Sequence, residues 1–178
     1  KTPLTDRELA VRLSYLLWSA PPDEQLFALA KNGKLKDSKV LTSQVDRMLD
    51  DPRSERFSKA FMAQWMDLSR FDQIAINNKK FPLFDKALRD SVKAEPLKFF
   101  NVLLKENLSV TNLIDSGFVV INSSLGQHYG ISGADKPGFH KVKLAGNFQR
   151  GGLMTMASFL TMGSTGERTS PIIRGALI

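Results

Sequence analysis

The chain has 178 residues, of which 42% are hydrophobic and 24% are charged, and this balance is typical of a globular domain and excludes a disordered chain. Cysteine is absent, which excludes disulfides, cysteine-ligated zinc, a cysteine nucleophile and covalent haem attachment within this chain. The net charge of +7 comes largely from the C-terminal end, where no run of Lys and Arg and little aromatic interleaving occur, so a nucleic-acid partner is not predicted. The apolar runs are too short to span a bilayer.

The first 35 residues predict two helices. Thr5 and Glu8 have the spacing of a capping box, and apolar residues follow at helical intervals until Pro21-Pro22 ends the pattern. Asp23 is placed to cap a second, shorter helix that ends at Asn32-Gly33.

Two further amphipathic helices are predicted between residues 41 and 68. The first has its apolar stripe over residues 41–49 and stops at Asp51-Pro52, and the second opens at Ser54. Aromatic residues recur on one face of the second helix, and a tryptophan lies on the apolar face of the first helix of the chain. The side chains that we expect to be buried on this basis are Trp18, Phe57, Phe61 and Trp65.

The middle of the chain predicts a long helical pattern that is interrupted once. Pro82 suits the first turn of a helix, and apolar spacing continues from it to Pro96, where we expect a kink or a break. Residues 109–114 and 122–129 have the pattern of short helices, the second of which is closed by Gly130.

After Gly130 the character of the sequence changes. Residues 140–144 alternate like a short strand, residues 153–160 form an apolar run typical of a buried helix, and Ser170-Pro171 marks another helix start. The predicted fold is mainly α, a multi-helix orthogonal bundle with at most a short strand or hairpin near residues 140–144. More than half of residues 1–131 should be helical. Because the last predicted helix has barely begun at Ile178, we expect the chain to be a fragment of a longer protein.

No catalytic or metal site is predicted. The only histidines, His128 and His140, are not spaced as a helical metal pair, and His128 lies in a last helical turn, where an imidazole interacts favourably with the terminal carbonyls. No nucleophile-elbow or metalloprotease motif is present, and the paired carboxylates fall at helix ends. The sequence leaves enzymatic activity undecided and leans against it for this chain.

One segment near the C-terminus has the composition of an anion site. Residues 163–171 combine a flexible Gly/Ser/Thr loop with the start of a helix, and arginines occur within and on both sides of this segment. Capping and loop formation alone are the alternative explanation. The hypothetical anion-binding residues are Arg150, Arg168, Thr169, Ser170 and Arg174.

Several ordered motifs resemble families of exported bacterial proteins. They are Leu13-Ser-Tyr-Leu-Leu-Trp-Ser-Ala-Pro-Pro-Asp-Glu24, Val45-Asp-Arg-Met-Leu-Asp-Asp-Pro-Arg53, Gln64-Trp65, Phe81-Pro-Leu-Phe-Asp85 and Asn122-Ser-Ser-Leu-Gly-Gln-His-Tyr-Gly130. Together they resemble a planctomycete secreted domain over residues 5–131. Arg150-Gly-Gly-Leu153 and Arg168-Thr-Ser-Pro-Ile-Ile-Arg-Gly175 resemble the start of the planctomycete cytochrome-c-associated domain, so that residues 132–178 would be its truncated N-terminal part.

The resemblance implies a context and no mechanism, because both families have no assigned activity. It implies a periplasmic or secreted protein, with no cofactor in this chain and a haem c in a downstream domain. We therefore interpret the chain as a non-catalytic scaffold or docking domain whose partners are other domains of the same polypeptide. The alternative is a module that binds acidic polysaccharide or another anionic polymer through its basic C-terminal end.

Overall fold

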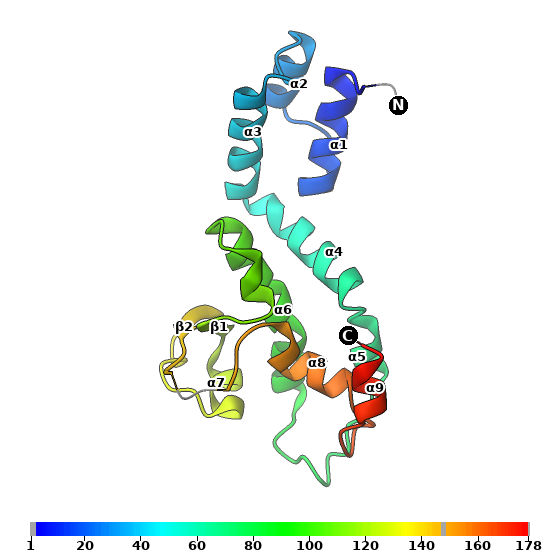
Figure 1. Ribbon diagram of the computed structural model, residues 1–178, viewed down its shortest axis with the longest axis vertical. Coiled ribbons are helices and arrows are strands. Elements are labelled where there is room, and N and C mark those ends of the chain that lie inside the picture. Colours follow the sequence, from blue (N-terminus) through cyan, green and yellow to red (C-terminus); the bar gives the residue numbers. More distant parts are fainter. Residues whose placement is uncertain (1–2, 147–148, 178) are drawn as a thin grey trace. The chain divides into compact units, whose positions relative to one another are not determined.

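The computed structural model describes residues 3–146 and 149–177 and forms two compact units (Figure 1). The N-terminal unit is Lys1–Ala60 and the C-terminal unit is Phe61–Ile178. The described residues are mainly helical, with one two-stranded antiparallel sheet, so the predicted fold class is confirmed. More than half of the described residues up to 131 lie in helices, as predicted. The division between units falls inside a helix and does not test the family boundary predicted at 131/132.

The N-terminal unit is a group of helices whose ends are set by local capping. Thr5 and Glu8 form the predicted capping box, with the Thr5 amide donating to Glu8 at 2.7 Å. Asp23 caps the second helix and Asp37 caps the third. The elements are α1 (Asp6–Trp18), α2 (Glu24–Lys31), α3 (Ser38–Asp50), the 3-10 turn η1 (Pro52–Ser54) and the start of α4 (Glu55–Trp65).

Trp18 lies in the N-terminal core, as predicted. Its side chain is fully buried, and its indole N–H donates to the carbonyl of Met48 at 2.9 Å. It belongs to a buried apolar cluster with residues of all three helices, among them Leu26, and with Leu35 of the turn between α2 and α3. A buried indole whose N–H has a partner combines a large apolar area with no unsatisfied donor, so this residue defines how the three helices pack.

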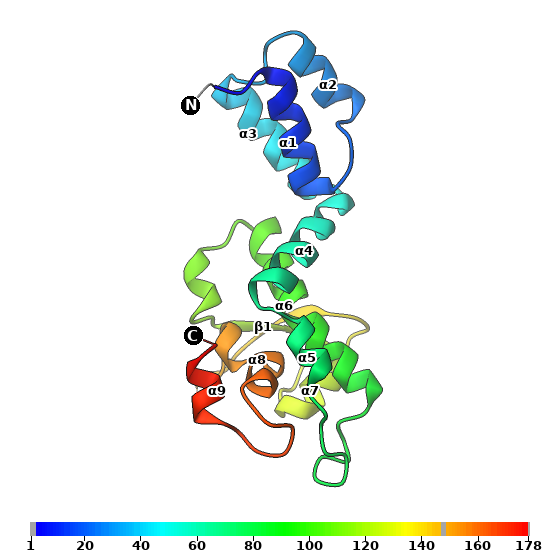
Figure 2. The same cartoon turned by 90° about the vertical axis from the view of Figure 1, so that its right-hand side faces the viewer.

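The C-terminal unit is organised around its longest helix, α6 (Lys86–Lys105). Figure 2 shows α5, α7 and α8 grouped near this helix, and β1, α7 and α8 all contact it. The other elements are α5 (Ser69–Gln73), η2 (Val110–Leu113), β1 (Phe118–Ile121), α7 (Ser123–Tyr129), β2 (His140–Lys143), η3 (Leu153–Thr155), α8 (Ala157–Met162) and α9 (Pro171–Gly175).

Two expectations for the central helix were wrong. It starts at Lys86 and not at Pro82, because the Asp85 carboxylate accepts a hydrogen bond from the Leu88 amide at 2.8 Å and caps the helix there. It also runs through Pro96 without a break. Pro96 is buried, so tertiary packing of the helix offsets the backbone hydrogen bond that a proline cannot donate.

The sheet contains one strand that was predicted and one that was not. β2 begins at His140, as expected, and pairs in antiparallel register with β1, in which Phe118 lies opposite Lys143. All four residues of β1 are buried. A short apolar run buried on both faces has no alternation, so its pattern does not distinguish a strand from a buried helix.

The expected burial of the α4 aromatic face was wrong for two of its three residues. Phe57 is partly buried against the N-terminal core, but Phe61 is 39% exposed and Trp65 is 55% exposed. Phe61 stacks on Phe100 at a centroid distance of 5.1 Å and contacts Trp65 at 5.6 Å. Met62 is the fully buried residue of this stretch. Helical periodicity locates the apolar stripe, whereas the packing partners decide which residues of the stripe are covered.

Candidate functional site: a basic and aromatic pocket

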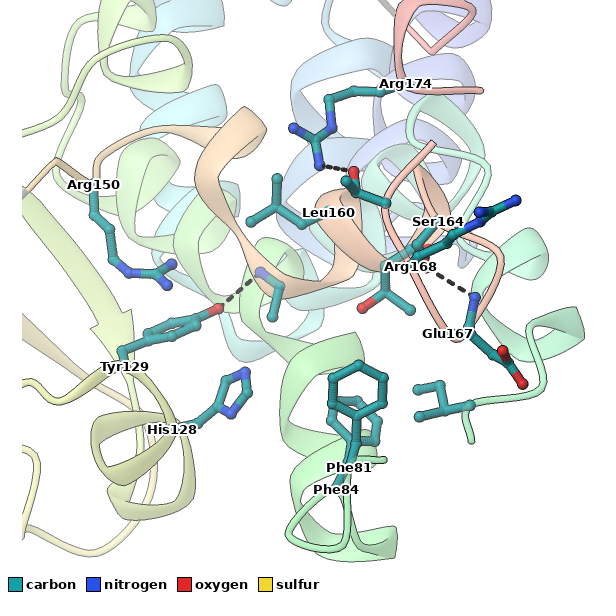
Figure 3. Close-up of a pocket in the computed structure, with 15 residues that line it drawn as sticks. Phe81, Phe84, His128, Tyr129, Arg150, Leu160, Ser164, Glu167, Arg168 and Arg174 are labelled. Carbon is teal, nitrogen blue, oxygen red and sulfur yellow. Dashed lines mark hydrogen bonds between the residues drawn. The ribbon is translucent and has the colours of Figure 1, made fainter. Parts of the chain in front are cut away.

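The candidate site is a pocket of about 290 Å³ in the C-terminal unit (Figure 3). Three arginines and His128 lie in its lining, together with aromatic and aliphatic side chains. The residues that line it are Ile76, Phe81, Phe84, His128, Tyr129, Arg150, Ala157, Leu160, Thr161, Ser164, Gly166, Glu167, Arg168, Thr169 and Arg174. The pocket combines a cationic part with an apolar part, which is the usual composition of a small-ligand site.

The last turn of α7 provides one wall. Asn122 caps the start of this helix and Gly130, with φ +66°, closes it, so that His128 and Tyr129 emerge side by side. The His128 ring meets Phe84 edge-on at a centroid distance of 6.2 Å. The prediction that His128 lies in a last helical turn is confirmed.

A double glycine places Arg150 in front of this wall. Gly151 and Gly152 both have positive φ, and a Cβ on Gly152 would lie 2.2 Å from the carbonyl oxygen of Ile114, so only glycine allows the loop to pack this closely. The Arg150 guanidinium then lies 3.8 Å from the Tyr129 ring centroid and donates to the Thr155 carbonyl at 2.8 Å. These contacts fix the direction of the cation.

The loop between α8 and α9 forms the opposite wall. The two ends of this loop are joined by an isolated β-bridge between Ser164 and Thr169, and the Ser170 amide donates to the Gly163 carbonyl at 3.0 Å. Gly166 has φ +82° and a Cβ there would lie 2.1 Å from the Ala75 carbonyl oxygen, so this glycine holds the loop against the segment that precedes α6.

The structure places four of the five hypothetical anion-binding residues in this pocket. Arg150, Arg168, Thr169 and Arg174 line it, whereas Ser170 caps α9 by accepting from the Ile173 amide at 3.4 Å. Arg174 donates to the Thr169 hydroxyl at 2.5 Å. In Figure 3 the Arg168 side chain is directed away from the guanidinium groups of the other two arginines, so Arg168 lies at the rim.

The pocket has an excess of positive charge. Within residues 3–146 and 149–177, no carboxylate forms an ion pair with Arg150, Arg168 or Arg174. The one acidic lining residue, Glu167, is engaged by Lys80 at 3.3 Å and by the Asn77 side chain at 2.9 Å. These two partners, Asn77 first, lower the Glu167 pKa. The Nε of Arg174 is buried without a hydrogen-bond partner among the described residues.

Behind the pocket wall lies a buried carboxyl that the sequence interpretation missed. Glu95 is 1% exposed, and the Tyr129 hydroxyl donates to its Oε2 at 2.5 Å. Burial raises the Glu95 pKa to about 7, against the opposing effects of the Tyr129 hydrogen bond and the Arg150 charge. Burial likewise lowers the pKa of His128 and raises that of Tyr129. A signal was available: Glu95 follows Leu88 and Val92 and precedes Phe99 at helical spacing, so it falls on the apolar face of α6.

No metal site accompanies this pocket. Across the described ranges, no group of three or more His, Asp or Glu side chains is arranged to hold a metal ion. The same residues include no helix that is both long enough and apolar enough to cross a bilayer.

Comparison with known proteins defines the class. The chain matches the family model described as PSD4, a protein of unknown function (DUF1592), over residues 4–131. This match covers well over half of the chain, which therefore belongs to the PSD4 family, the planctomycete secreted domain 4. The predicted resemblance over residues 5–131 is confirmed. No curated protein and no solved structure matches the chain. The pocket draws its α7 wall from the matched segment and its arginines from the residues beyond it.

Proposed function

We propose that this chain is a non-catalytic binding domain of an exported multidomain protein and that its pocket binds an anionic group carried on an apolar or ring-shaped body. The observation that supports this most directly is that Arg150 and Arg174 face one pocket and have no carboxylate partner within the described part of the chain. Both side chains are partly buried, and a partly desolvated cation is stabilised by a nearby anion.

The arrangement of the lining supports a ligand with two kinds of surface. A guanidinium offers parallel N–H donors that suit the oxygens of a carboxylate, sulfate or phosphate. Phe84, Leu160 and the 45% exposed Phe81 offer an apolar surface beside these donors. An inorganic ion would leave that apolar surface exposed to water, whereas an anion attached to a ring or a hydrocarbon chain would bury it.

The docking interpretation assigns this anion to another domain of the same polypeptide. A carboxylate side chain or the propionate of a haem in a downstream domain has the required chemistry. The alternative occupant is an acidic polysaccharide, which is favoured by one feature, the exposed Phe81 ring at the pocket, because aromatic faces pack well against sugar rings.

Calorimetric titration with benzenesulfonate tests the proposal on the full chain. This probe has an anionic group on a ring and stays ionised across the working pH range, and neutral benzenesulfonamide is its matched control. Benzenesulfonate should bind at least about tenfold more tightly than the sulfonamide, since one charge-assisted contact contributes about 1.5–3 kcal/mol.

Variants then locate the site. Arg150→Gln and Arg174→Gln should each weaken benzenesulfonate binding about tenfold or more, and Arg168→Gln should have a smaller effect. Arg7→Gln is the charge-matched control, because Arg7 is exposed in the N-terminal unit. Equal effects of all four substitutions would mean that only diffuse charge attracts the probe and would overturn the proposal.

Competition separates the two occupants. Oligogalacturonate that displaces benzenesulfonate would favour the polysaccharide alternative. A pocket that binds the probe but not the oligomer would favour a carboxylate presented by a neighbouring domain.

A further inference from the structure

Glu95 is an unusual residue for the middle of a helix that packs against a hydrophobic core. It lies directly before Pro96 in α6, and it is the one charged residue among the largest fully buried side chains of the described chain. A carboxyl group in such a place costs free energy when it is ionised. The anion-binding proposal above makes no use of this group.

Tyr129 connects this buried carboxyl with the pocket. Its hydroxyl donates to Glu95 and accepts from the Ala157 amide at 2.8 Å, and its ring forms part of the pocket wall (Figure 3). The Arg150 guanidinium stacks on the same ring. Tyr129 therefore contacts both the buried acid Glu95 and the pocket cation Arg150.

Arg150 is the cation that acts on both sides of this wall. Its charge stabilises the ionised form of Glu95, and its guanidinium also lines the pocket. Among the elements in contact with α6, α7 contributes His128 and Tyr129, whereas β1, η2 and α8 carry no titratable side chain. Charged side chains on this part of α6 also include Arg89, Asp90, Lys93 and Lys98, and Asp72 of α5 pairs with Lys93.

We infer that occupation of the pocket by an anion is coupled to the uptake of a proton by Glu95. This inference rests on the proposed binding function. An anion beside Arg150 screens the cation from Glu95 and adds a negative charge nearby in a poorly solvated region, and both effects favour the neutral carboxylic acid. By linkage, the protonated protein binds the anion more tightly than the ionised protein does.

The pKa of Glu95 sets the pH range over which the affinity for the anion changes. The pKa of Glu95 is about 7 in the free protein and rises in the complex. Affinity is therefore highest and constant below pH 7. It falls as the pH rises from about 7 to the pKa of the complex, by at most about tenfold per pH unit for one proton. Above that second pKa it is constant again.

Titration of benzenesulfonate calorimetrically at pH 7.5, in buffers of different ionisation enthalpy, measures the protons exchanged. The probe itself takes up no proton at this pH, so an uptake belongs to the protein. We expect a net uptake of a substantial fraction of one proton for the wild type and an uptake near zero for Glu95→Gln. Glutamine still accepts the Tyr129 hydrogen bond, so Glu95→Gln should bind the probe with an affinity that no longer depends on pH between 6.5 and 8.5.

His128 is the rival source of such a proton, and His128→Asn separates the two. If the uptake persists in His128→Asn and vanishes in Glu95→Gln, the coupling belongs to Glu95. If it vanishes in His128→Asn and persists in Glu95→Gln, the inference is overturned. Carbon NMR of the Glu95 carboxyl in the wild-type chain, with and without benzenesulfonate, needs no variant. An unchanged pKa in the complex contradicts the inference even though the probe binds, whereas failure of the probe to bind contradicts the proposed function itself.

Discussion

Both units stack arginine on an aromatic ring, fully buried in Trp18 and partly buried in Tyr129, but they balance the charge in different ways. In the N-terminal unit the Arg53 guanidinium lies 3.5 Å from the Trp18 ring centroid, and it is held by Asp51 at 2.7 Å. Arg47 stacks on the same tryptophan at 5.4 Å, and Asp23 pairs with it at 2.7 Å. Each cation of this cluster has its own carboxylate at the surface.

In the C-terminal unit the same contact lacks the surface acid. Arg150 stacks on Tyr129 at 3.8 Å, but the acid on which its charge acts, Glu95, is buried and bonded to the hydroxyl of that tyrosine. The paired arginines of the N-terminal unit complete a structural cluster, whereas the unpaired arginine faces a pocket. A stacked arginine by itself thus does not indicate function. The position of the carboxylate that compensates its charge distinguishes a structural cluster from a candidate binding site.

The largest expected effect concerns the ring of the N-terminal cluster. Trp18→Ala should lower the free energy of unfolding by about 3–5 kcal/mol, because it removes a fully buried indole and its hydrogen bond to Met48. Chemical denaturation followed by far-UV circular dichroism measures it. Trp65→Ala is the control, with an expected loss below about 1 kcal/mol for a side chain that is 55% exposed. Similar losses of unfolding free energy for both variants would contradict the difference in burial between Trp18 and Trp65.

The second effect is a stability slope with pH in the C-terminal unit. The Glu95 pKa is about 7 in the folded chain, above its ordinary value of 4.5, so the folded state holds the proton more tightly. The contribution of Glu95 to stability should therefore be complete below pH 4.5 and fall by up to about 3 kcal/mol as the pH rises to 7. Denaturation followed by Trp65 fluorescence in a Trp18→Phe background reports this unit. Glu95→Gln should remove the slope, and a slope that survives the substitution belongs to another group.

The third effect compares two glycines with positive φ. Gly166→Ala should cost about 2–3 kcal/mol and abolish benzenesulfonate binding, because a Cβ would meet the Ala75 carbonyl oxygen at 2.1 Å and displace the pocket loop. Gly33→Ala in the N-terminal unit has open space around the new Cβ. Its free energy of unfolding should therefore fall only by about 1 kcal/mol, the cost of the left-handed backbone conformation for alanine. Thermal denaturation of both variants checks the difference. Equal losses of stability in the two variants would mean that the loop around Gly166 accommodates the new Cβ without strain.

The smallest effect is an acid-induced loss in the N-terminal unit, with the opposite slope to that of Glu95. The Arg53 hydrogen bonds lower the pKa of Asp51 from 3.8 to about 2. The stabilisation is therefore complete above pH 3.8 and is lost as the pH falls to about 2. Because the pair is partly exposed, Asp51→Asn should cost only about 1 kcal/mol at pH 7 and nothing at pH 2. Denaturation followed by Trp18 fluorescence in a Trp65→Phe background measures this difference, and an equal cost at both values of pH would exclude the ion pair as its source.

Much of the helical framework could be predicted from the sequence, because helix ends depend on contacts within one turn. The capping box of Thr5 and Glu8, the caps at Asp23 and Ser170, and the glycine that closes the helix at Gly130 all occur as predicted. The family of the chain was also recognisable from ordered motifs over residues 5–131, and the match confirms it.

The tertiary structure decided the features that depend on residues far apart in the chain. The exposure of Phe61 and Trp65, the unbroken helix through Pro96 and the pairing of β1 with β2 depend on what packs against each segment, which periodicity does not specify.

The pocket shows the same limit. The sequence by itself determined that basic residues gather after residue 135 and that Arg150, Arg168 and Arg174 are candidates for an anion. Only the fold decided that Arg150 and Arg174 line one pocket with His128, that Arg168 lies at the rim, and that Glu95 lies behind the wall. The physical reason is that charge and composition are properties of the residues, whereas desolvation and the distance between charges are properties of their packing.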